Sequence, residues 1–282
     1  MNEVIKFDTL AQHLNQRTFV DYYNRLSLLA KSLFEWENLP NGINERWIEK
    51  YLFHEGQCVF FEDETKGLMV AKCSTYGRLN NYDEPIRVKP YGTNYSGTPL
   101  KVNKECVIIR NNEMSTPTRP TLELYAYRLT DITRTIDVNI KCQKRPNIIL
   151  CTEKQKNSLK RLLEKVDDNE IAIYGSNNLD TDGITTLKNE VPAIFPQLQL
   201  QKHQVWNECL TFLGINNANQ DKRERLVADE VQANNEHVEF SANVFLKERQ
   251  DACDAINKMF KLDPPITVKL RDIAESEVQL ND

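Results

Sequence analysis

The sequence predicts an α+β protein that is mainly helical, and three observations favour this fold class. Apolar residues recur at spacings of three and four in several long stretches, which is the period of an amphipathic helix. Short runs rich in β-branched and aromatic residues lie between residues 57 and 112 and predict a small sheet. A composition of 40% hydrophobic and 27% charged residues over 282 residues indicates a globular chain that is long enough for a sizeable core.

The first helix is predicted over residues 17–38. The segment Pro40–Gly42 is expected to end it, because proline and glycine break helical periodicity. One apolar stripe runs along the helix and is interpreted as a packed core face. Its members are Phe19, Tyr22, Leu26, Leu29, Leu33 and Trp36.

Residues 57–112 are predicted to form a small, mostly antiparallel sheet. Turn-prone segments such as Asn80–Asp83 and Tyr91–Asn94 separate the expected strands. The clearest strand candidates are three apolar runs, namely Cys58–Phe61, Leu68–Ala71 and Cys106–Ile109.

A second long helix is predicted over residues 120–141. Pro120 suits the first helical position, where its missing N–H costs nothing, and Pro146 should stop any continuation. The apolar positions have heptad-like spacing, which favours long helices packed side by side. They are Leu122, Tyr125, Leu129, Ile132 and Ile136.

The segment 147–190 is predicted to be a small α/β insert. Ile148–Leu150 and Ile171–Tyr174 have the composition of strands, and residues 153–166 between them have that of a charged helix. A further helix is predicted over about 193–213, with Gly214 as its stop.

The last part of the chain is predicted to be a charged loop followed by a helix. Residues 216–239 are polar and carry charges of both signs. Residues 240–261 form the expected helix, which Pro264–Pro265 should close. One face of this helix carries Phe245, Ala252, Ile256 and Met259.

Composition and charge narrow the possible function classes. There is no run of eighteen apolar residues, and Met1–Val4 lacks the form of a signal peptide, so we expect a protein made and kept in a cytosol. The 7 cysteines contain no CxxC pair and are expected to be reduced, mostly buried thiols. A net charge of −5 argues against a protein that binds nucleic acid tightly, but not against one through which nucleic acid passes.

The motifs of common enzyme classes are absent from the sequence. There is no P-loop, no GxGxxG after a strand, no HExxH and no nucleophile elbow, and the 4 histidines are scattered. Asp180, Asp182 and Glu190 could be argued as a magnesium site, although Asp180–Gly183 is also an ordinary turn. We therefore expect no enzymatic activity, no cofactor and no metal.

Several stretches of the chain are similar to one protein family. They are Leu33–Pro40 (LFEWENLP), Pro120–Leu124 (PTLEL), and a long series that runs from Val205–Glu208 (VWNE) through Thr211–Ile215 (TFLGI), Asn219 and Asp229–Val231 (DEV) to Val244–Lys247 (VFLK). In these stretches the chain resembles the portal proteins (upper collar, head–tail connector) of small short-tailed phages with protein-primed linear genomes.

The resemblance implies a homododecameric ring at one vertex of the capsid in the virion. Double-stranded phage DNA would enter and leave through the channel, and the other partners would be the capsid protein, the lower collar or tail protein, a packaging ATPase and a packaging RNA. The portal-type protomer would consist of a wing (1–119), stem helices (120–145 and 193–214), a clip (146–192), a tunnel loop (215–239) and a crown end (240–282).

The resemblance also suggests which residues face the channel. Lys188 fits a channel lysine near the clip–stem junction, whereas the second such position falls on Gln197. In a ring, Lys222, Arg223 and Arg225 would form a basic belt. They could equally be solvated loop charges, because Asp221, Glu224, Asp229 and Glu230 lie nearby and could neutralise them.

Heptad-spaced and neighbouring apolar residues are expected to mediate packing within and between protomers. The residues assigned to this packing are Trp36, Leu122, Leu129, Trp206, Phe212, Gly214 and Phe245.

Two other function classes compete with the portal hypothesis. A lower-collar or tail protein also forms rings, but it should be richer in sheet. A metal-dependent packaging nuclease would depend on Asp180 and Asp182, yet it would need further acidic residues converging from other elements.

Overall fold

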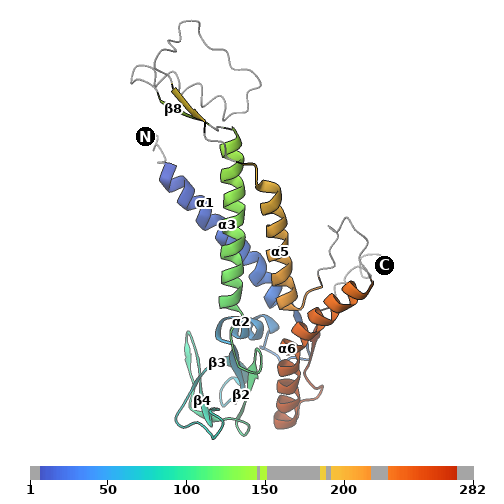
Figure 1. The fold of residues 1–282 in the computed structure, drawn as a ribbon. Coiled ribbons are helices and arrows are strands. Elements are labelled where there is room, and N and C mark those ends of the chain that lie inside the picture. The colour runs from blue at the N-terminus through green and yellow to red at the C-terminus, as the bar shows by residue number, and fades with distance from the viewer. Residues whose placement is uncertain (1–6, 145–146, 151–184, 189–191, 217–227, 272–282) are drawn as a thin grey trace, which may run out of the picture. The chain divides into compact units, whose positions relative to one another are not determined.

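A computed structural model describes residues 7–144, 147–150, 185–188, 192–216 and 228–271 (Figure 1). The chain divides into two compact units, of which the first contains Met1–Tyr127 and Val205–Asp282 and the second contains Arg128–Gln204. Helices α3 (Arg119–Lys144) and α5 (Phe195–Leu213) each have residues in both units. The mainly helical α+β class predicted from the sequence is confirmed.

The first unit contains a six-stranded antiparallel sheet. The strand order is β5-β4-β3-β2-β7, and β6 also pairs with β4. The sheet predicted for residues 57–112 is thereby confirmed. The strands are β2 (Gln57–Asp63), β3 (Gly67–Thr75), β4 (Arg87–Gly92), β5 (Tyr95–Ser96), β6 (Leu100–Lys101) and β7 (Cys106–Arg110).

Strand β2 is buried on both faces, which explains its continuous apolar run. Successive side chains of a strand point to opposite faces, so Phe60 joins the main core while Phe61 joins a smaller core on the other face. The register pairs Phe60 with Val107 and Phe61 with Cys106 on β7, and each pair belongs to a single core. A register slip of one residue would exchange these two apolar sets.

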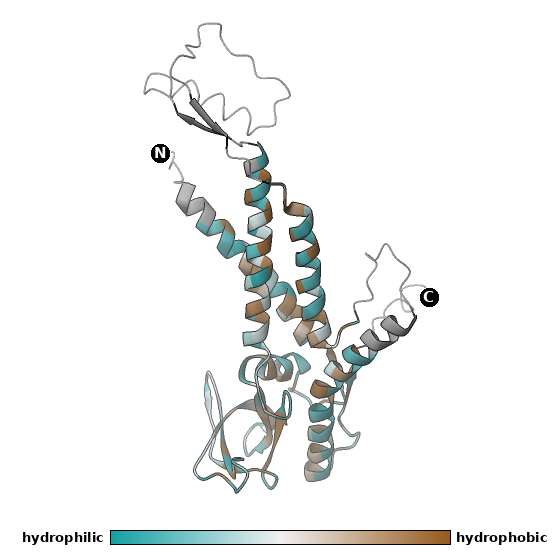
Figure 2. Ribbon diagram, in the orientation of Figure 1, coloured by the Kyte–Doolittle hydropathy of each residue, from teal (hydrophilic) through white to brown (hydrophobic). Residues whose placement is uncertain are grey.

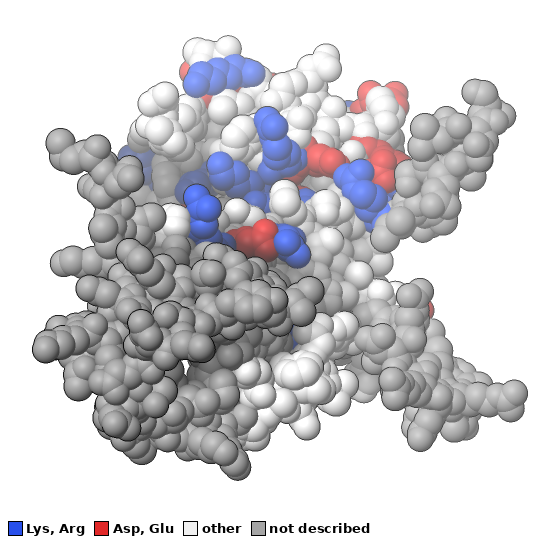
Figure 3. Space-filling view, turned by 90° about the horizontal axis from the view of Figure 1, so that it is seen from above, with Lys and Arg blue, Asp and Glu red and all other residues white. Residues whose placement is uncertain are grey.

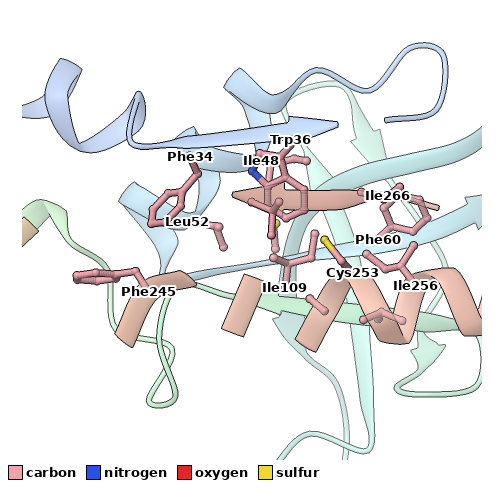
Figure 4. Close-up of a cluster of buried hydrophobic side chains, with 14 residues drawn as sticks. Phe34, Trp36, Ile48, Leu52, Phe60, Ile109, Phe245, Cys253, Ile256 and Ile266 are labelled. Atoms are coloured by element: carbon pink, nitrogen blue, oxygen red, sulfur yellow. The ribbon is translucent and has the colours of Figure 1, made fainter. Parts of the chain in front are cut away.

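The main core joins segments that are far apart in the sequence (Figure 4). Besides β2 and β7, it draws on β1 (Phe34–Glu37), α2 (Glu45–Glu55), α6 (Ala228–Phe260) and β10 (Thr267–Leu270). Figure 4 shows the side chains of these elements converging on one another. Its fully enclosed members include Ile48, Leu52, Ile109 and Ile256.

The prediction of a helix over residues 17–38 was wrong at its C-terminal end. Helix α1 spans Phe7–Lys31, and β1 follows it and pairs antiparallel with β10. Phe34 and Trp36 are both buried and lie two residues apart. This spacing matches a strand, in which every second side chain points to the same face. Glu37 of β1 pairs with Thr267 of β10, which lies 230 residues further along the chain. No local sequence pattern could therefore reveal this pairing of strands.

The helices predicted over 120–141 and 193–213 are confirmed as α3 and α5. Figure 2 shows hydrophobic and hydrophilic residues interleaved along both. In the second unit, Asn139 donates to the carbonyl of Pro192 (2.9 Å) and accepts from the N–H of Ile194 (3.3 Å), which fixes the chain as it enters α5.

The insert contains a two-stranded antiparallel sheet of β8 (Asn147–Leu150) and β9 (Thr185–Lys188). Strand β8 coincides with the predicted strand Ile148–Leu150. The other predicted elements, the strand Ile171–Tyr174 and the helix 153–166, lie outside the described residues, as does Pro146.

The charged stretch assigned to a loop over 215–239 is partly helical. Helix α6 begins at Ala228, twelve residues before the predicted start at 240, and ends at Phe260. The loop was predicted from the polar composition alone. This was wrong because Ala, Glu and Gln are good helix formers whether or not they face a core. Residues 217–227 lie outside the described part of the chain.

Gly214 ends α5, as the sequence predicts, and it also allows α5 to approach α6. Its φ is +76°, in the left-handed region that favours glycine. A Cβ atom at this position would lie 2.6 Å from the Cα of Ala242 on α6, so a side chain would collide with backbone. The glycine therefore fixes both the helix end and its contact with α6.

We predict that Gly214→Ala lowers the free energy of unfolding more than Gly42→Ala does. Both glycines have positive φ, but no atom lies within 4 Å of a Cβ at Gly42. The control should lose ~1–2 kcal/mol from backbone strain alone, and Gly214→Ala a further ~1–3 kcal/mol from overpacking. Urea unfolding measures both, and equal losses would contradict the close approach of the helices.

Candidate functional site

A salt bridge between Glu49 of α2 and Arg249 of α6 lies inside the main core. Each residue is 2% exposed. The Arg249 Nε donates to Glu49 Oε1 (2.9 Å) and a terminal nitrogen donates to Oε2 (2.7 Å). This bidentate geometry is the strongest form of an arginine–carboxylate pair.

The remaining donors of Arg249 are also used. Its terminal nitrogens donate to the carbonyl oxygens of Asn111 (3.1 Å) and Phe245 (2.9 Å) and to the side-chain oxygen of Asn111 (3.2 Å). The guanidinium carbon lies 4.1 Å from the centre of the Phe34 ring. All five N–H groups of the guanidinium therefore have acceptors, which a charge needs inside a core.

Glu49 ties the pair to strand β1. The indole Nε1 of Trp36 donates to Glu49 Oε1 at 2.9 Å, so this oxygen accepts from both Trp36 and Arg249. Trp36, assigned from the sequence to a helix, thus lies on a strand and is 7% exposed. Its packing position depends on a hydrogen bond as well as on apolar contact.

Asn111 ties the pair to the start of α3. Its amide nitrogen donates to the hydroxyl of Thr118 (2.9 Å) and to the carbonyl of Thr116 (2.8 Å). The carbonyl of Thr118 accepts from the N–H of Leu122, in the first turns of α3. A continuous chain of contacts therefore runs from α6 through the core to the helix that the resemblance assigns to the stem.

Within the first unit, the end of α5 packs against α3 and α6 through aromatic residues. The Phe212 ring lies 5.9 Å from Phe245 in an edge-on arrangement and 6.4 Å from Tyr125. The Tyr125 hydroxyl donates to Glu208 at 3.1 Å. These contacts bring together two residues that the sequence assigns to packing, Phe212 and Phe245.

The other residues assigned to packing vary in burial. Leu122 and Leu129 are completely buried on α3, whereas Trp206 on α5 is half-buried. Glu49, Asn111 and Arg249 were not selected from the sequence. Arg249 gave the only signal, because it lies four residues after Phe245 and three before Ala252, on the apolar face of the last helix.

Exposed apolar side chains mark candidate contacts between subunits. In the first unit, α3 exposes Leu124 (63%) and Tyr127 (55%), although Tyr127 also stacks on Phe19 of α1 at 4.3 Å. In the second unit, Val138 and Leu200 are exposed. Neighbouring exposed apolar side chains are the expected feature of surfaces that a partner covers, and Leu124 and Tyr127 are three residues apart on one face of α3.

Of the residues assigned to the channel, Lys188 lies in a described element. Lys188 is the last residue of β9 and pairs with Asn147, but its side chain is not among those described. Lys222, Arg223 and Arg225 lie outside the described residues. Figure 3 shows that on one face of the molecule the described Lys and Arg side chains gather with Asp and Glu between them.

The described residues hold no group of three or more His, Cys, Asp or Glu side chains arranged to bind a metal ion. Asp180, Asp182 and Glu190 lie outside the described part of the chain. Among the helices that were described, none is both long and apolar enough to span a bilayer. Burial raises the pKa of the Cys73 and Cys253 thiols to about 12, so these cysteines are protonated and unreactive at neutral pH.

We predict that Arg249→Met lowers the free energy of unfolding by ~3–5 kcal/mol, because it leaves the Glu49 carboxylate buried without its partner. The double variant Arg249→Met/Glu49→Gln should lose clearly less than the sum of the two single variants. Arg25→Met is the control, since Arg25 and Asp21 form an ion pair whose side chains are 61% and 53% exposed; it should change stability by less than ~0.5 kcal/mol. Additive losses in the double variant would contradict the pairing.

The whole chain is similar to phage portal proteins. The family model described as Phage Connector (GP10) matches residues 5–274. A solved structure of the portal and tail of native bacteriophage P68 contains a chain with 17% sequence identity and a TM-score of 0.52, and the match covers 99% of this chain and 95% of that one. An HK97 family phage portal protein from Corynebacterium diphtheriae has 11% identity and a TM-score of 0.46, over 92% of this chain and 94% of that one.

The family match extends over both units and nearly all described elements, and the P68 chain has a similar fold. Portal proteins are structural, non-enzymatic subunits that form oligomeric rings with tail components. This supports the portal hypothesis over the lower-collar and nuclease alternatives. The chain therefore belongs to the Phage Connector (GP10) family and is the portal subunit at the head–tail junction of a phage virion.

Proposed function

We propose that this portal protein assembles into a homododecamer whose channel conducts double-stranded DNA during packaging and ejection. The observation that carries the proposal is helix α3. One end of it is tied to the buried Arg249 network, and the same first-unit segment exposes Leu124 and Tyr127 to solvent. A helix that is held by its own core and exposes neighbouring apolar side chains suits contact with an adjacent subunit.

The parts of the protomer are proposed from the family resemblance. Residues 1–119 form the wing, α3 and α5 the stem, and residues 146–192 the clip. The tunnel loop was assigned to residues 215–239, but α6 begins at Ala228, so the loop ends before that residue. Residues 240–282 form the crown end. Helix α6 and β10 belong to the same compact unit as the proposed wing and share its core.

The channel is proposed to carry few and weak positive groups. DNA bears one charge per ~1.7 Å of helix axis, so a densely basic bore would hold it in place. A protomer of net charge −5 with Lys188, Lys222, Arg223 and Arg225 towards the bore would give isolated rings of positive charge. Such rings would contact each phosphate briefly, which suits passage of DNA and resists backward slip.

The proposed partners are the capsid protein, the lower collar or tail protein and a packaging ATPase. A packaging RNA is a further proposed partner. The first sixteen residues contain Lys6 as their one Lys or Arg, beside Glu3 and Asp8. An RNA would therefore need cationic residues other than those of this segment.

We predict that Leu124→Arg prevents ring formation while the subunit stays folded. The side chain is 63% exposed in the single chain, so the charge costs little there, but it would be buried at a subunit contact. Met114→Arg, at a position that is 79% exposed in a loop, is the control and should still form rings. Light scattering and negative-stain microscopy measure ring size, and intact rings of Leu124→Arg would rule out this contact.

We also predict that the triple variant Lys222→Ala/Arg223→Ala/Arg225→Ala assembles and melts like the wild type but retains less DNA in the head. Contacts of this kind are screened beyond ~8 Å at physiological salt, so their loss should leave the fold unaffected. Nuclease-protected DNA per head is the measurement. Normal retention would mean that these residues are solvated loop charges and not a channel belt.

A further inference from the structure

An open pocket lies where the end of α1, the outer face of α2 and the end of β10 meet. Its volume is about 540 Å³. The lining is rich in cations, and it includes Glu45 as its acidic member. The lining residues are Leu28, Lys31, Ser32, Glu45, Arg46, Trp47, Lys50 and Arg271.

The positive charge of this pocket is not balanced by the described side chains. Glu45 is already paired with Arg271 at 2.8 Å and accepts a hydrogen bond from the N–H of Trp36. Lys31, Arg46 and Lys50 have no carboxylate partner among the residues that the structure describes. Burial and the nearby Lys50 ammonium lower the pKa of Lys31, which is the direction expected where an anion is missing.

The pocket also offers apolar surface next to its cations. Trp47 is 40% exposed, and the charged groups of Arg46 and Lys50 lie 5.0 and 4.7 Å from its ring centre. Leu28 of α1 is 66% exposed. Cations held over an aromatic ring beside an exposed leucine suit a ligand that is both acidic and apolar.

The chain itself contains a segment with these properties, directly after the pocket. Residues 272–282 include no Lys or Arg, and their apolar residues are spaced among the acidic ones. The acidic residues are Asp272, Glu275, Glu277 and Asp282, and the large apolar ones are Ile273, Val278 and Leu280.

The attachment point of this segment is fixed at the rim of the pocket. The N–H of Arg271 donates to the carbonyl of Leu33 (2.8 Å), and its guanidinium donates to the carbonyl of Ser32 (3.1 Å) and to Glu45. Each further residue can extend the chain by ~3.3–3.6 Å, so the following residues reach every part of the pocket. A tethered segment of this kind has an effective concentration on the order of millimolar.

We propose that residues 272–282 dock in the pocket of their own chain, with their carboxylates on Lys31, Arg46 and Lys50 and their apolar side chains on Trp47 and Leu28. The docked segment covers the exposed tryptophan and joins α1 to α2 on the outside of the unit. It neutralises a cluster of cations that would otherwise be free to bind nucleic acid or another acidic partner.

Hydrogen–deuterium exchange of the full-length protein, followed on the peptide that contains residues 272–282, tests this docking. The peptide should exchange about tenfold more slowly in the wild type than in Lys31→Glu/Lys50→Glu, which corresponds to a few surface ion pairs. Protection should fall in 1 M salt, because screening shortens the range of the charges. Lys104→Glu, an exposed lysine in the loop between β6 and β7, is the control and should leave the exchange unchanged.

Two outcomes would overturn the proposal. The first is wild-type exchange of residues 272–282 at the rate of an unfolded peptide, or at a rate that the charge reversal does not alter. The second comes from mixed assemblies of Lys31→Glu/Lys50→Glu chains with chains truncated after Arg271. If the peptide of the charge-reversed chain becomes protected there, the pocket of a neighbouring copy is the one that binds it.

Discussion

A guanidinium and a carboxylate, Arg249 and Glu49, meet inside a core that is otherwise apolar, and the elements of the first unit are tied to them. Trp36 of β1 donates to Glu49, and Arg249 itself lies on α6. Asn111, at the end of β7, accepts from Arg249 and donates to Thr118 at the start of α3. A buried pair adds little stability over an apolar core of the same volume, but it penalises every arrangement in which one charge is buried alone. We infer that this penalty fixes how α6 lies on α2 and β7, where apolar contacts alone would allow sliding.

This constraint matters for a subunit of a ring. In a closed ring every subunit uses the same pair of surfaces, so a small error in one subunit is repeated at each contact. Helix α3 carries exposed apolar residues, and its first turns are linked to Arg249 through Thr118 and Asn111. Gly214 adds a second constraint, because it sets how closely α5 approaches α6. The surface proposed for ring contact is thus linked to the core of its own subunit.

The sequence predicts the elements that have a strong local pattern. Strands β2, β3 and β7 and helices α3 and α5 follow from apolar periodicity, and the end of α5 follows from Gly214. Strand β1 was missed because Trp36 continues the helical spacing of α1, while its true partner β10 comes near the other end of the chain. The Glu49–Arg249 pair joins residues 200 apart, and no periodicity relates two such positions. Arg249 on an apolar face shows that a buried partner is needed, but not which carboxylate supplies it.

The most direct test of this account is an electron cryo-microscopy reconstruction of the assembled protein that resolves side chains. We expect Arg249 to be paired with Glu49 of the same chain inside the core of every subunit, and a neighbouring subunit to cover Leu124 and Tyr127 on α3. A ring in which Arg249 instead pairs across a subunit boundary, or in which this part of α3 faces solvent, would contradict it.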